Sequence, residues 1–377
     1  MDKDKIKILT IIGTRPEIIR LSRIIPKLDE FFDHNLVHTG QNYDYELNEI
    51  FFSDLELRRP DYYLDCARNS SAETIAQIIE KVDRLLAQIE PDAVLILGDT
   101  NSALSAIPAK RRKIPIFHME AGNRCFDMRV PEEINRRIVD HISDINIPYS
   151  KIARDYLLRE GLNPSTIVVS GSPMNEVLDY YDEKISKSNV LKKFEISRGK
   201  YFVASLHREE NVDLQSKLEN IVCTLNEICE TQKMPIILSL HPRTRKQLDK
   251  LSLSLHSDIR ISKPLCFTDY IKLQANSRLV LSDSGTITEE ASIMNFPAIN
   301  LRDTHERPEG MEQAAVILCP VNTKYINSAI EILDTQGRDE NRSINIVDDY
   351  YDKNISEKII RIIISHIDFI NQLVWKK

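Results

Sequence analysis

The sequence predicts an α/β protein with two doubly wound lobes, and three observations lead to this prediction. Short β-branched and aliphatic runs alternate with segments of helical period along the chain, which is typical of parallel β-α units. The 377 residues are enough for two domains of roughly 150 residues each. A charged stretch with few apolar residues, 182–200, separates two series of strand candidates and is expected to join the lobes.

The strands of the first lobe are expected at 6–12, 36–38, 93–97, 115–119 and 167–169. Those of the second lobe are expected at 201–206, 235–240, 278–281 and 298–301. Helices between them include 73–89, 214–231 and 268–275, and 355–374 is expected to be a closing helix. Ligands of doubly wound sheets bind beyond the carboxyl ends of the strands, so the residues that follow each strand are the functional candidates.

The overall charge excludes one class of partner. Lys and Arg number 50 against 57 Asp and Glu, which gives a net charge of -7 and a pI near 5.8. A protein that binds nucleic acid along its length needs clustered basic residues, so we expect no nucleic-acid partner. The six cysteines show no metal-ligand spacing, so we expect reduced thiols and no metal. The sequence shows no signal-peptide pattern and no long apolar segment, so we expect a cytoplasmic location and no membrane partner.

The turn after the first strand reads Gly13-Thr-Arg15-Pro-Glu. A helix that begins here offers unpaired N–H groups to an anion, and Arg15 adds a bidentate donor for phosphate. An ordinary β-α turn with a solvated arginine is the alternative. No G-x-G-x-x-G follows this strand, and no Walker loop is present there, so neither NAD nor ATP is favoured and no cofactor is expected.

A second turn, after 278–281, reads Ser-Asp-Ser284-Gly285 and opens a helix that carries Glu289 and Glu290. Serine hydroxyl and backbone N–H groups hold phosphate, and a carboxylate one turn later accepts two hydroxyls of a ribose, which together indicate a nucleotide. A plain serine N-cap followed by acidic residues is the alternative. Tyr270 is a candidate to stack on the base, or a core aromatic residue.

Three carboxylates, Asp99, Glu120 and Glu132, follow successive strands of the first lobe. Acids gathered at one sheet edge repel one another, which separates proton donors from acceptors and suits acid–base chemistry. Taken alone, an aspartate in G-D-T is more often a turn former. His207 ends the first strand of the second lobe and is a candidate acid or phosphate ligand, as are His241 and His305, with Arg243, Arg302 and Arg307 near them in sequence.

The motifs G-T-R-P-E, L-G-D-T, H-M-E-A-G, P-E-E-I-N-R, L-H-R-E-E-N, S-D-S-G-x-x-x-E-E and R-D-T-x-E-R-P-E occur in this order from Gly13 to about Pro320. In this the chain resembles the non-hydrolysing UDP-N-acetylglucosamine 2-epimerase family. The resemblance implies two Rossmann-like lobes of the glycosyltransferase-B type, a nucleotide-sugar in the cleft between them, and a homodimer. It also implies that the terminal helix returns to the first lobe, which then comprises 1–172 and 355–377, the second being 173–354.

The resemblance implies elimination of UDP across C1–C2 to a glycal, re-addition of UDP and reprotonation of C2 from the opposite face, without a redox cofactor. The catalytic group that it implies is Asp99, Glu120, Glu132 and His207. The candidate UDP or substrate contacts are Arg15, Arg124, Arg136, His241, Arg243, Tyr270, Ser284, Gly285, Glu290 and Arg307. Glu120 or Asp99 is expected to be the base and Glu132 the opposing donor.

The chain departs from the common bacterial pattern at two places. It reads Gly40-Gln-Asn-Tyr-Asp where that pattern has G-Q-H-x-x-M, in the region of the allosteric site of that branch, and it reads Asn123-Arg-Cys-Phe where that pattern has L-R-T. With H-R-E-E-N, these variants resemble the branch that converts UDP-2-acetamido-2,6-dideoxy-L-talose to UDP-N-acetyl-L-fucosamine for capsule or O-antigen synthesis. UDP-N-acetylglucosamine epimerisation, a hydrolysing relative, a glycosyltransferase and a non-catalytic nucleotide-sugar binder are the alternatives.

Overall fold

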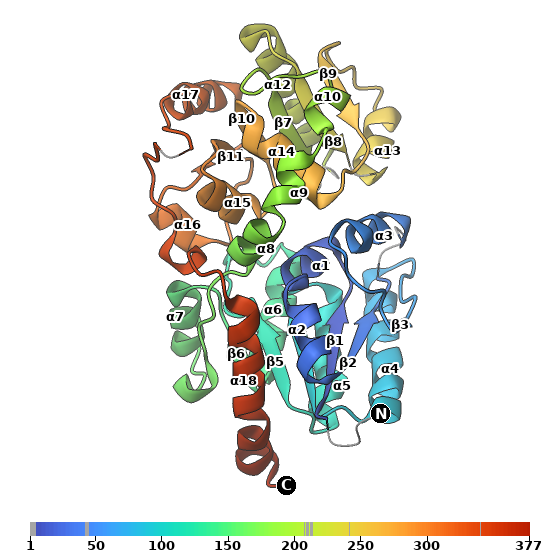
Figure 1. The fold of residues 1–377 in the computed structure, drawn as a ribbon. Coiled ribbons are helices and arrows are strands. Elements are labelled where there is room, and N and C mark those ends of the chain that lie inside the picture. The colour runs from blue at the N-terminus through green and yellow to red at the C-terminus, as the bar shows by residue number, and fades with distance from the viewer. Residues whose placement is uncertain are drawn as a thin grey trace. The chain divides into compact units, whose positions relative to one another are not determined.

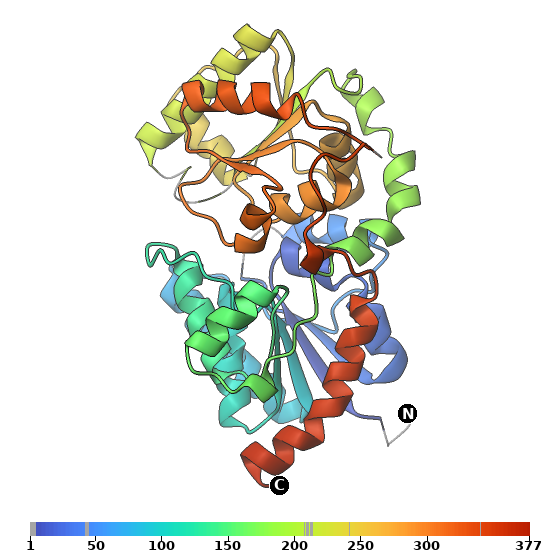
Figure 2. The ribbon, with the colours of Figure 1, turned by 90° about the vertical axis from the view of Figure 1, so that its left-hand side faces the viewer.

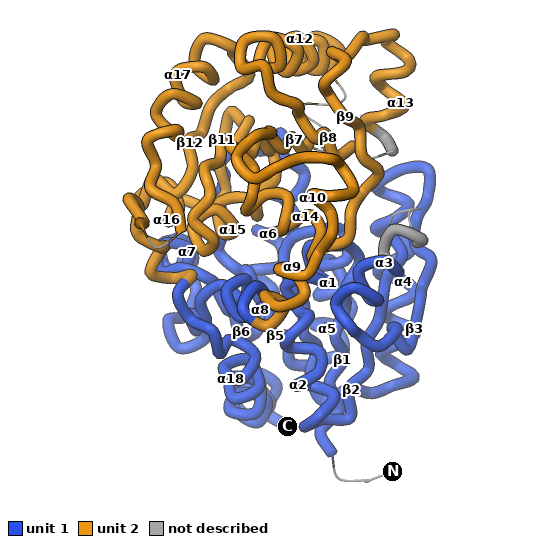
Figure 3. Tube along the Cα trace, turned by 45° about the horizontal axis from the view of Figure 1, so that its top comes forward, with its two compact units in different colours: residues 1–179, 351–377 blue, residues 180–350 orange. Residues whose placement is uncertain are grey.

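The computed structural model describes residues 5–41, 45–206, 208, 211, 214–240, 242–339 and 341–377. The chain forms two compact units, residues 1–179 with 351–377 (unit 1) and residues 180–350 (unit 2), coloured separately in Figure 3. Each unit contains one parallel six-stranded sheet, so the predicted α/β class with two doubly wound lobes is confirmed. Among the described residues, no helix combines the length and apolar character needed to cross a bilayer.

Unit 1 has the strand order β3-β2-β1-β4-β5-β6. Its elements are β1 (Lys7–Ile12), α1 (Arg15–Leu21), α2 (Ile24–Phe31), β2 (Asp33–His38), α3 (Tyr45–Asp54), β3 (Tyr62–Tyr63), α4 (Ser71–Ile89), β4 (Ala93–Leu97), α5 (Ala106–Arg111), β5 (Ile116–Met119), α6 (Pro131–Ile142), β6 (Ile145–Ile147), α7 (Lys151–Arg159), α8 (Met174–Tyr180) and α18 (Ile355–Ile370). Helices α4, α5 and α6 pack their apolar residues on one face of this sheet, and Figure 1 shows α1, α2 and α18 on the other.

Unit 2 has the order β12-β11-β10-β7-β8-β9, which is the same doubly wound arrangement. Its elements are α9 (Asp182–Lys187), α10 (Val190–Lys193), β7 (Phe202–Leu206), α12 (Gln215–Gln232), β8 (Ile236–Leu240), α13 (Pro242–Lys250), β9 (Ile259–Ser262), α14 (Phe267–Asn276), β10 (Leu279–Ser282), α15 (Ile287–Met294), β11 (Ala298–Asn300), α16 (Pro308–Glu312), β12 (Ile317–Leu318) and α17 (Thr323–Leu333). Helices α12 and α17 pack on one face of the sheet, and α10, α14 and α15 on the other.

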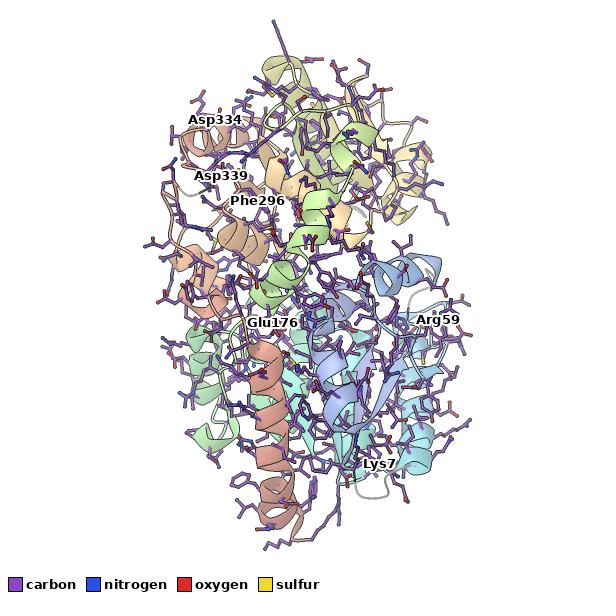
Figure 4. The ribbon with its side chains drawn as sticks, viewed as in Figure 1. Lys7, Arg59, Glu176, Phe296, Asp334 and Asp339 are labelled. Atoms are coloured by element: carbon purple, nitrogen blue, oxygen red, sulfur yellow. The ribbon has the colours of Figure 1, made fainter. Side chains whose placement is uncertain are left out.

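Helix α18 belongs to unit 1 although unit 2 precedes it in the chain. Figure 2 shows this helix running along unit 1. Glu176 of α8 lies near its first turn (Figure 4) and accepts hydrogen bonds from the backbone N–H, at 2.7 Å, and the hydroxyl of Ser356. Asn175 donates to the carbonyl of Tyr351 at 2.7 Å, and Lys358 donates to the carbonyl of Ser170 at 3.0 Å. These bonds fix the start of α18 on unit 1.

The predicted strand at 167–169 is wrong. Only a single bridge joins Ile167 to Asn146, because the segment follows the short turn Pro164–Thr166 and runs beside β6 without extending the ladder. Strand β6 itself was not expected, since three residues with a polar one in the middle carry too little apolar pattern. The closing helix begins at Ile355, as predicted.

Candidate functional site

The candidate residues of unit 1 follow β1, β4 and β5, three adjacent strands at the centre of the sheet. The register pairs Ile11 with Ile96 and Leu97 with Met119, so the three strands end at one edge. The strand order reverses between β1 and β4, and a doubly wound sheet binds its ligand at such a switch point. The turns that begin at Gly13, Gly98 and Glu120 therefore lie together at the place where this fold accepts ligands.

The first of these turns is tied to the second by Glu17, which the sequence did not single out. Its carboxylate, only 2 % exposed, accepts hydrogen bonds from the backbone of Gly13, the backbone of Thr14 at 3.1 Å and the hydroxyl of Thr100 at 2.8 Å. Burial raises the pKa of Glu17 to about 7, although these hydrogen bonds oppose the rise. Arg15, at the start of α1, is half-buried and lies 5.8 Å from the ring of Phe51.

Glu120 is the most constrained of the predicted carboxylates. It directly follows β5 with a φ of +62°, a left-handed backbone that costs energy in a residue with a Cβ and is often found at functional sites. Its side chain is buried, with Arg20 Nη1 2.6 Å from Oε2 and Asn123 Nδ2 3.3 Å from Oε1. The cation and the amide fix the position of the carboxylate at the end of β5.

Asp99 and Glu132 differ in their surroundings. Asp99 Oδ2 lies 2.7 Å from Arg136 Nη2, and about a fifth of its side chain is exposed. Glu132 is half-buried in the first turn of α6 and makes no hydrogen bond or ion pair with any described residue. Its neighbour Glu133 is fully buried and pairs with Arg136 and Arg137. The two candidate carboxylates therefore differ in whether a described cation contacts them.

A continuous set of ion pairs runs from Asp99 through α6 and α7 and returns to the β4–β5 edge. We call this set the charge ring, and it comprises Asp99, Arg136, Glu133, Arg137, Glu160, Arg124, Asp140 and His118. Outside the ring, the exposed His141 also contacts Glu160, at 3.0 Å. Hydrogen bonds from Arg124 lower the pKa of Glu160 to about 2, so this part of the ring is ionised at neutral pH.

Arg124 and Arg136, predicted as substrate contacts, both belong to the charge ring. The guanidinium of Arg124 is fully buried and lies 2.7 Å from Asp140 and 2.6 Å from Glu160. These two ion pairs indicate that Arg124 stabilises the fold, because a contact with substrate would require them to break. Arg136 is also almost fully buried but contacts Asp99, so it stabilises a candidate catalytic carboxylate.

The turn after β10 in unit 2 carries the residues predicted to bind phosphate. Ser284 Oγ lies 3.0 Å from Thr286 Oγ1 and accepts the N–H of Thr286 at 3.3 Å, immediately before α15 begins. A side chain added at Gly285 would first meet Glu306, at 3.4 Å. One turn further along α15, the buried Glu290 accepts a hydrogen bond from Gln274 at 2.9 Å. The hydroxyl, N–H and carboxylate groups therefore follow in the order that a phosphate and a ribose require.

Arginines surround this turn in unit 2. Arg208 Nη2 is 3.3 Å from Glu306 and lies 3.8 Å from where a Cβ of Gly285 would be placed. Arg302 Nη2 is 3.0 Å from the same glutamate, and the buried Arg307 lies 3.3 Å from Glu289. Cationic side chains held by acidic partners beside a Ser-Gly turn suit a diphosphate.

Three predicted residues are not fully covered by the structure. His207 and His241 lie outside the described residues, and the side chain of Arg243 is likewise not described.

Tyr270, on α14, is half-buried and packs against the apolar cluster on the face of the sheet that α14 covers. In the described part of the chain, no group of three or more His, Cys, Asp or Glu side chains is placed to hold a metal ion.

Sequence reasoning also missed Arg20, the partner of Glu120. It lies inside α1, where the strand-end rule does not reach, and it is the basic residue in the last turn of that helix. A basic residue within a helix that begins at a ligand-binding edge is a sign of a possible site residue. The helical period alone does not tell whether such a residue lies on the buried face of the helix. Arg208, the arginine of the motif L-H-R-E-E-N, was not predicted as a contact either.

Comparison with known proteins gives the chain a family. The model of the family described as UDP-N-acetylglucosamine 2-epimerase matches residues 27–364. The solved structure of UDP-N-acetylglucosamine 2-epimerase from Rickettsia bellii is 48% identical, with a TM-score of 0.91 over 99% of this chain and 100% of that chain. The enzyme of Methanocaldococcus jannaschii, solved with UDP-GlcNAc and UDP, is 36% identical, with a TM-score of 0.89 over 96% and 100% of the two chains.

A third relative has a different sugar in its name. The UDP-2,3-diacetamido-2,3-dideoxy-D-glucuronate 2-epimerase of Pseudomonas aeruginosa is 36% identical over 317 residues, which are 83% of this chain and 88% of that one. The match of the family model, the two sheets of the glycosyltransferase-B type and these full-length similarities agree with one another. The chain is an isomerase that belongs to the UDP-N-acetylglucosamine 2-epimerase family.

Proposed function

We propose that the protein inverts C2 of a UDP-2-acetamido sugar by eliminating UDP to a glycal and adding it back. The observation that carries this proposal is Glu120, a buried carboxylate with a left-handed backbone, held between Arg20 and Asn123 at the switch point of the unit 1 sheet. A C2 proton beside an acetamido group is weakly acidic, so a positioned carboxylate and a good leaving group are both needed.

The surroundings of the three carboxylates suggest their roles. Glu120 and Asp99 each contact an arginine, at 2.6 and 2.7 Å, and are the proposed bases that remove the C2 proton. Glu132 makes no ion pair with a described residue and is the candidate to return a proton from the opposite face. Inversion requires an acid and a base on the two faces of C2, and the proposal assigns these roles to Glu132 and to Glu120 or Asp99.

Unit 2 supplies the groups for the UDP moiety in this proposal. The turn at Ser284 and Gly285 receives a phosphate, Glu290 receives the ribose hydroxyls, and Arg208 with Arg307 stabilises the charge that develops on the departing diphosphate. His207 and His241 keep their proposed roles as acid and phosphate contact, and Arg15 remains a proposed phosphate contact of unit 1. Neither metal nor redox cofactor is part of the proposal.

For the sugar, we propose UDP-2-acetamido-2,6-dideoxy-L-talose, converted to UDP-N-acetyl-L-fucosamine for capsule or O-antigen synthesis. Support comes from Asn123, where the common bacterial pattern has leucine, because its amide lies 3.3 Å from the carboxylate of Glu120. A leucine there makes no such hydrogen bond, so the pocket beside the base differs. The names of the relatives favour a second candidate, UDP-N-acetylglucosamine, which gives UDP-N-acetylmannosamine.

The test is incubation with each UDP-sugar in heavy water, followed by proton NMR. We expect deuterium at C2 with inverted configuration, fastest for the 6-deoxy-L-talo substrate. Glu120→Gln should slow the exchange by about 10²- to 10⁴-fold, whereas Asn123→Leu should slow the L-talo substrate more than UDP-N-acetylglucosamine. Failure of every UDP-2-acetamido sugar to exchange C2 refutes the epimerase proposal, and exchange with UDP-N-acetylglucosamine alone replaces the proposed sugar. Accumulation of free UDP and free sugar in equal amounts would indicate a hydrolase.

We further propose that the enzyme acts in the cytoplasm as a homodimer, since it uses a nucleotide-activated sugar and resembles a family of dimers. Light scattering of the purified chain tests the dimer, because a mass equal to the 43.5 kDa monomer contradicts it.

A further inference from the structure

His118 is a buried histidine that the proposed chemistry does not use. It lies on β5, two residues before Glu120, and its side chain is not exposed. Its Nε2 is 2.8 Å from the carbonyl oxygen of Gly98, and its Nδ1 is 3.0 Å from Oδ1 of Asp140. A carbonyl oxygen only accepts, so Nε2 carries a proton, and a carboxylate calls for a second proton on Nδ1.

The charge state follows from these neighbours. Burial opposes the charged imidazole, but the negative carboxylate of Asp140, 3.0 Å from Nδ1, outweighs it and raises the pKa of His118. A neutral imidazole would leave a lone pair of Nδ1 facing the carboxylate, which is unfavourable in a buried site.

The His118–Asp140 pair holds both turns that carry the candidate bases. Gly98, whose carbonyl receives the Nε2 proton, directly precedes Asp99. Asp140 accepts the backbone N–H of Gly122 at 3.2 Å, two residues after Glu120. A side chain does not fit at Gly122, because a Cβ added there would lie 2.4 Å from the carbonyl oxygen of Ala153. One buried ion pair thus connects the backbone at Asp99 with the backbone at Glu120.

We propose that His118 is a positioning residue of the epimerase reaction. Its imidazolium, paired with Asp140, holds the carboxylates of Asp99 and Glu120 at the mutual position that proton transfer at C2 requires. This inference rests on the proposed function of the same site. His118 touches neither sugar nor UDP in the proposal, so its loss should lower the rate of the chemical step without weakening the binding of UDP.

The test uses two substitutions that each preserve one of the two contacts. His118→Gln places an amide donor near the Nε2 position and keeps the Gly98 contact, whereas His118→Asn keeps a donor toward Asp140. His34→Gln is the matched control, because His34 is another fully buried histidine of unit 1 that pairs with an aspartate, at 2.6 Å from Asp29, but at the start of β2. The readouts are kcat and KM for C2 deuterium exchange and the UDP affinity measured by calorimetry.

Both His118 variants should lose about 100-fold in kcat, the size of effect that a small misplacement of a catalytic group produces, with KM and UDP affinity unchanged. His34→Gln should keep the parent kcat. Parent rates in both His118 variants, or equal losses in His34→Gln, would overturn the inference. A fall of UDP affinity in proportion to kcat would also overturn it, since that pattern indicates general damage to the fold.

A measurement on the unaltered protein keeps the inference testable if the variants do not fold. The ¹⁵N shifts of the imidazole of His118 should show both nitrogens protonated at a pH at which a free imidazole has lost its proton, and a neutral ring at that pH contradicts the proposal. The proposed epimerase function and the positioning role of His118 are refuted by different results. Absence of C2 exchange in the parent refutes the proposed function, whereas normal exchange with inert His118 substitutions refutes only the positioning role.

Discussion

Glu17 gives a prediction about stability whose size follows from the structure. Its buried carboxylate binds the backbone of Gly13 and Thr14 and the hydroxyl of Thr100, and burial raises its pKa from 4.5 to about 7. Between these values the unfolded chain releases the proton while the folded chain retains it, so the free energy of unfolding falls as pH rises. The shift corresponds to about 3 kcal/mol, lost between about pH 4.5 and pH 7 and constant above that range.

The substitution Glu17→Gln removes this titration while it keeps an acceptor for the two backbone N–H groups. The only tryptophan, Trp375, belongs to unit 1, and its ring lies 5.0 Å from Lys110, so its fluorescence reports the unfolding of that unit. Urea unfolding at pH 5, 6, 7 and 8 should show the parent losing about 3 kcal/mol relative to Glu17→Gln across the series.

Glu73 provides the matched control for this substitution. It occupies the same third position of a helix, in α4, and accepts the backbone N–H of Ser70 at 3.2 Å, but it is exposed. Glu73→Gln should leave the pH dependence of the parent unchanged. A pH dependence of Glu17→Gln equal to that of the parent would refute the reasoning, because it would show that Glu17 titrates alike in the folded and unfolded chains.

Three further predictions concern activity and packing. Glu120→Gln should slow C2 deuterium exchange by about 10²- to 10⁴-fold with UDP affinity retained, and loss of UDP binding would contradict its placement at the sugar. Gly13→Ala should cost about 1–3 kcal/mol in urea unfolding, because its Cβ would lie 2.0 Å from Ser102 Oγ, and parent stability would contradict this packing. Tyr350→Phe should cost about 1–3 kcal/mol, because the buried Glu309 loses a 2.6 Å hydrogen bond, and a neutral effect on melting would show that this carboxyl finds another partner.

The strand-end rule accounts for most of what the sequence predicted about the site. Asp99, Glu120 and Ser284 follow strands whose apolar runs are visible in the sequence, and parallel sheets bring such turns to one edge. Glu132 and Glu133 mark the limit of this reasoning. Adjacent residues of a helix point about 100° apart, so one is buried with two arginines and the other makes no such pair, and the local pattern does not tell which.

The charge ring could not be predicted for a different reason. Arg124 and Glu160 are 36 residues apart, and Arg136 and Asp99 are joined across a strand and a helix. Such pairs depend on the docking of α6 and α7 against the sheet, which no periodicity encodes. Short strands could not be predicted either. Strand β9, for example, contains an arginine and a serine among its four residues, so its sequence resembles that of a loop.

The return of α18 to unit 1 has a consequence for the order in which the chain folds. Unit 2 is a continuous segment, 180–350, whereas unit 1 is assembled from two segments that flank it. Because synthesis proceeds from the N-terminus, unit 2 has emerged before α18 is available to cover the apolar residues of α2. Unit 2 can therefore complete its core on the ribosome, while unit 1 keeps an exposed apolar face until the last helix docks. We therefore expect the first segment of unit 1 to determine how strongly folding depends on chaperones, although this segment is synthesised first.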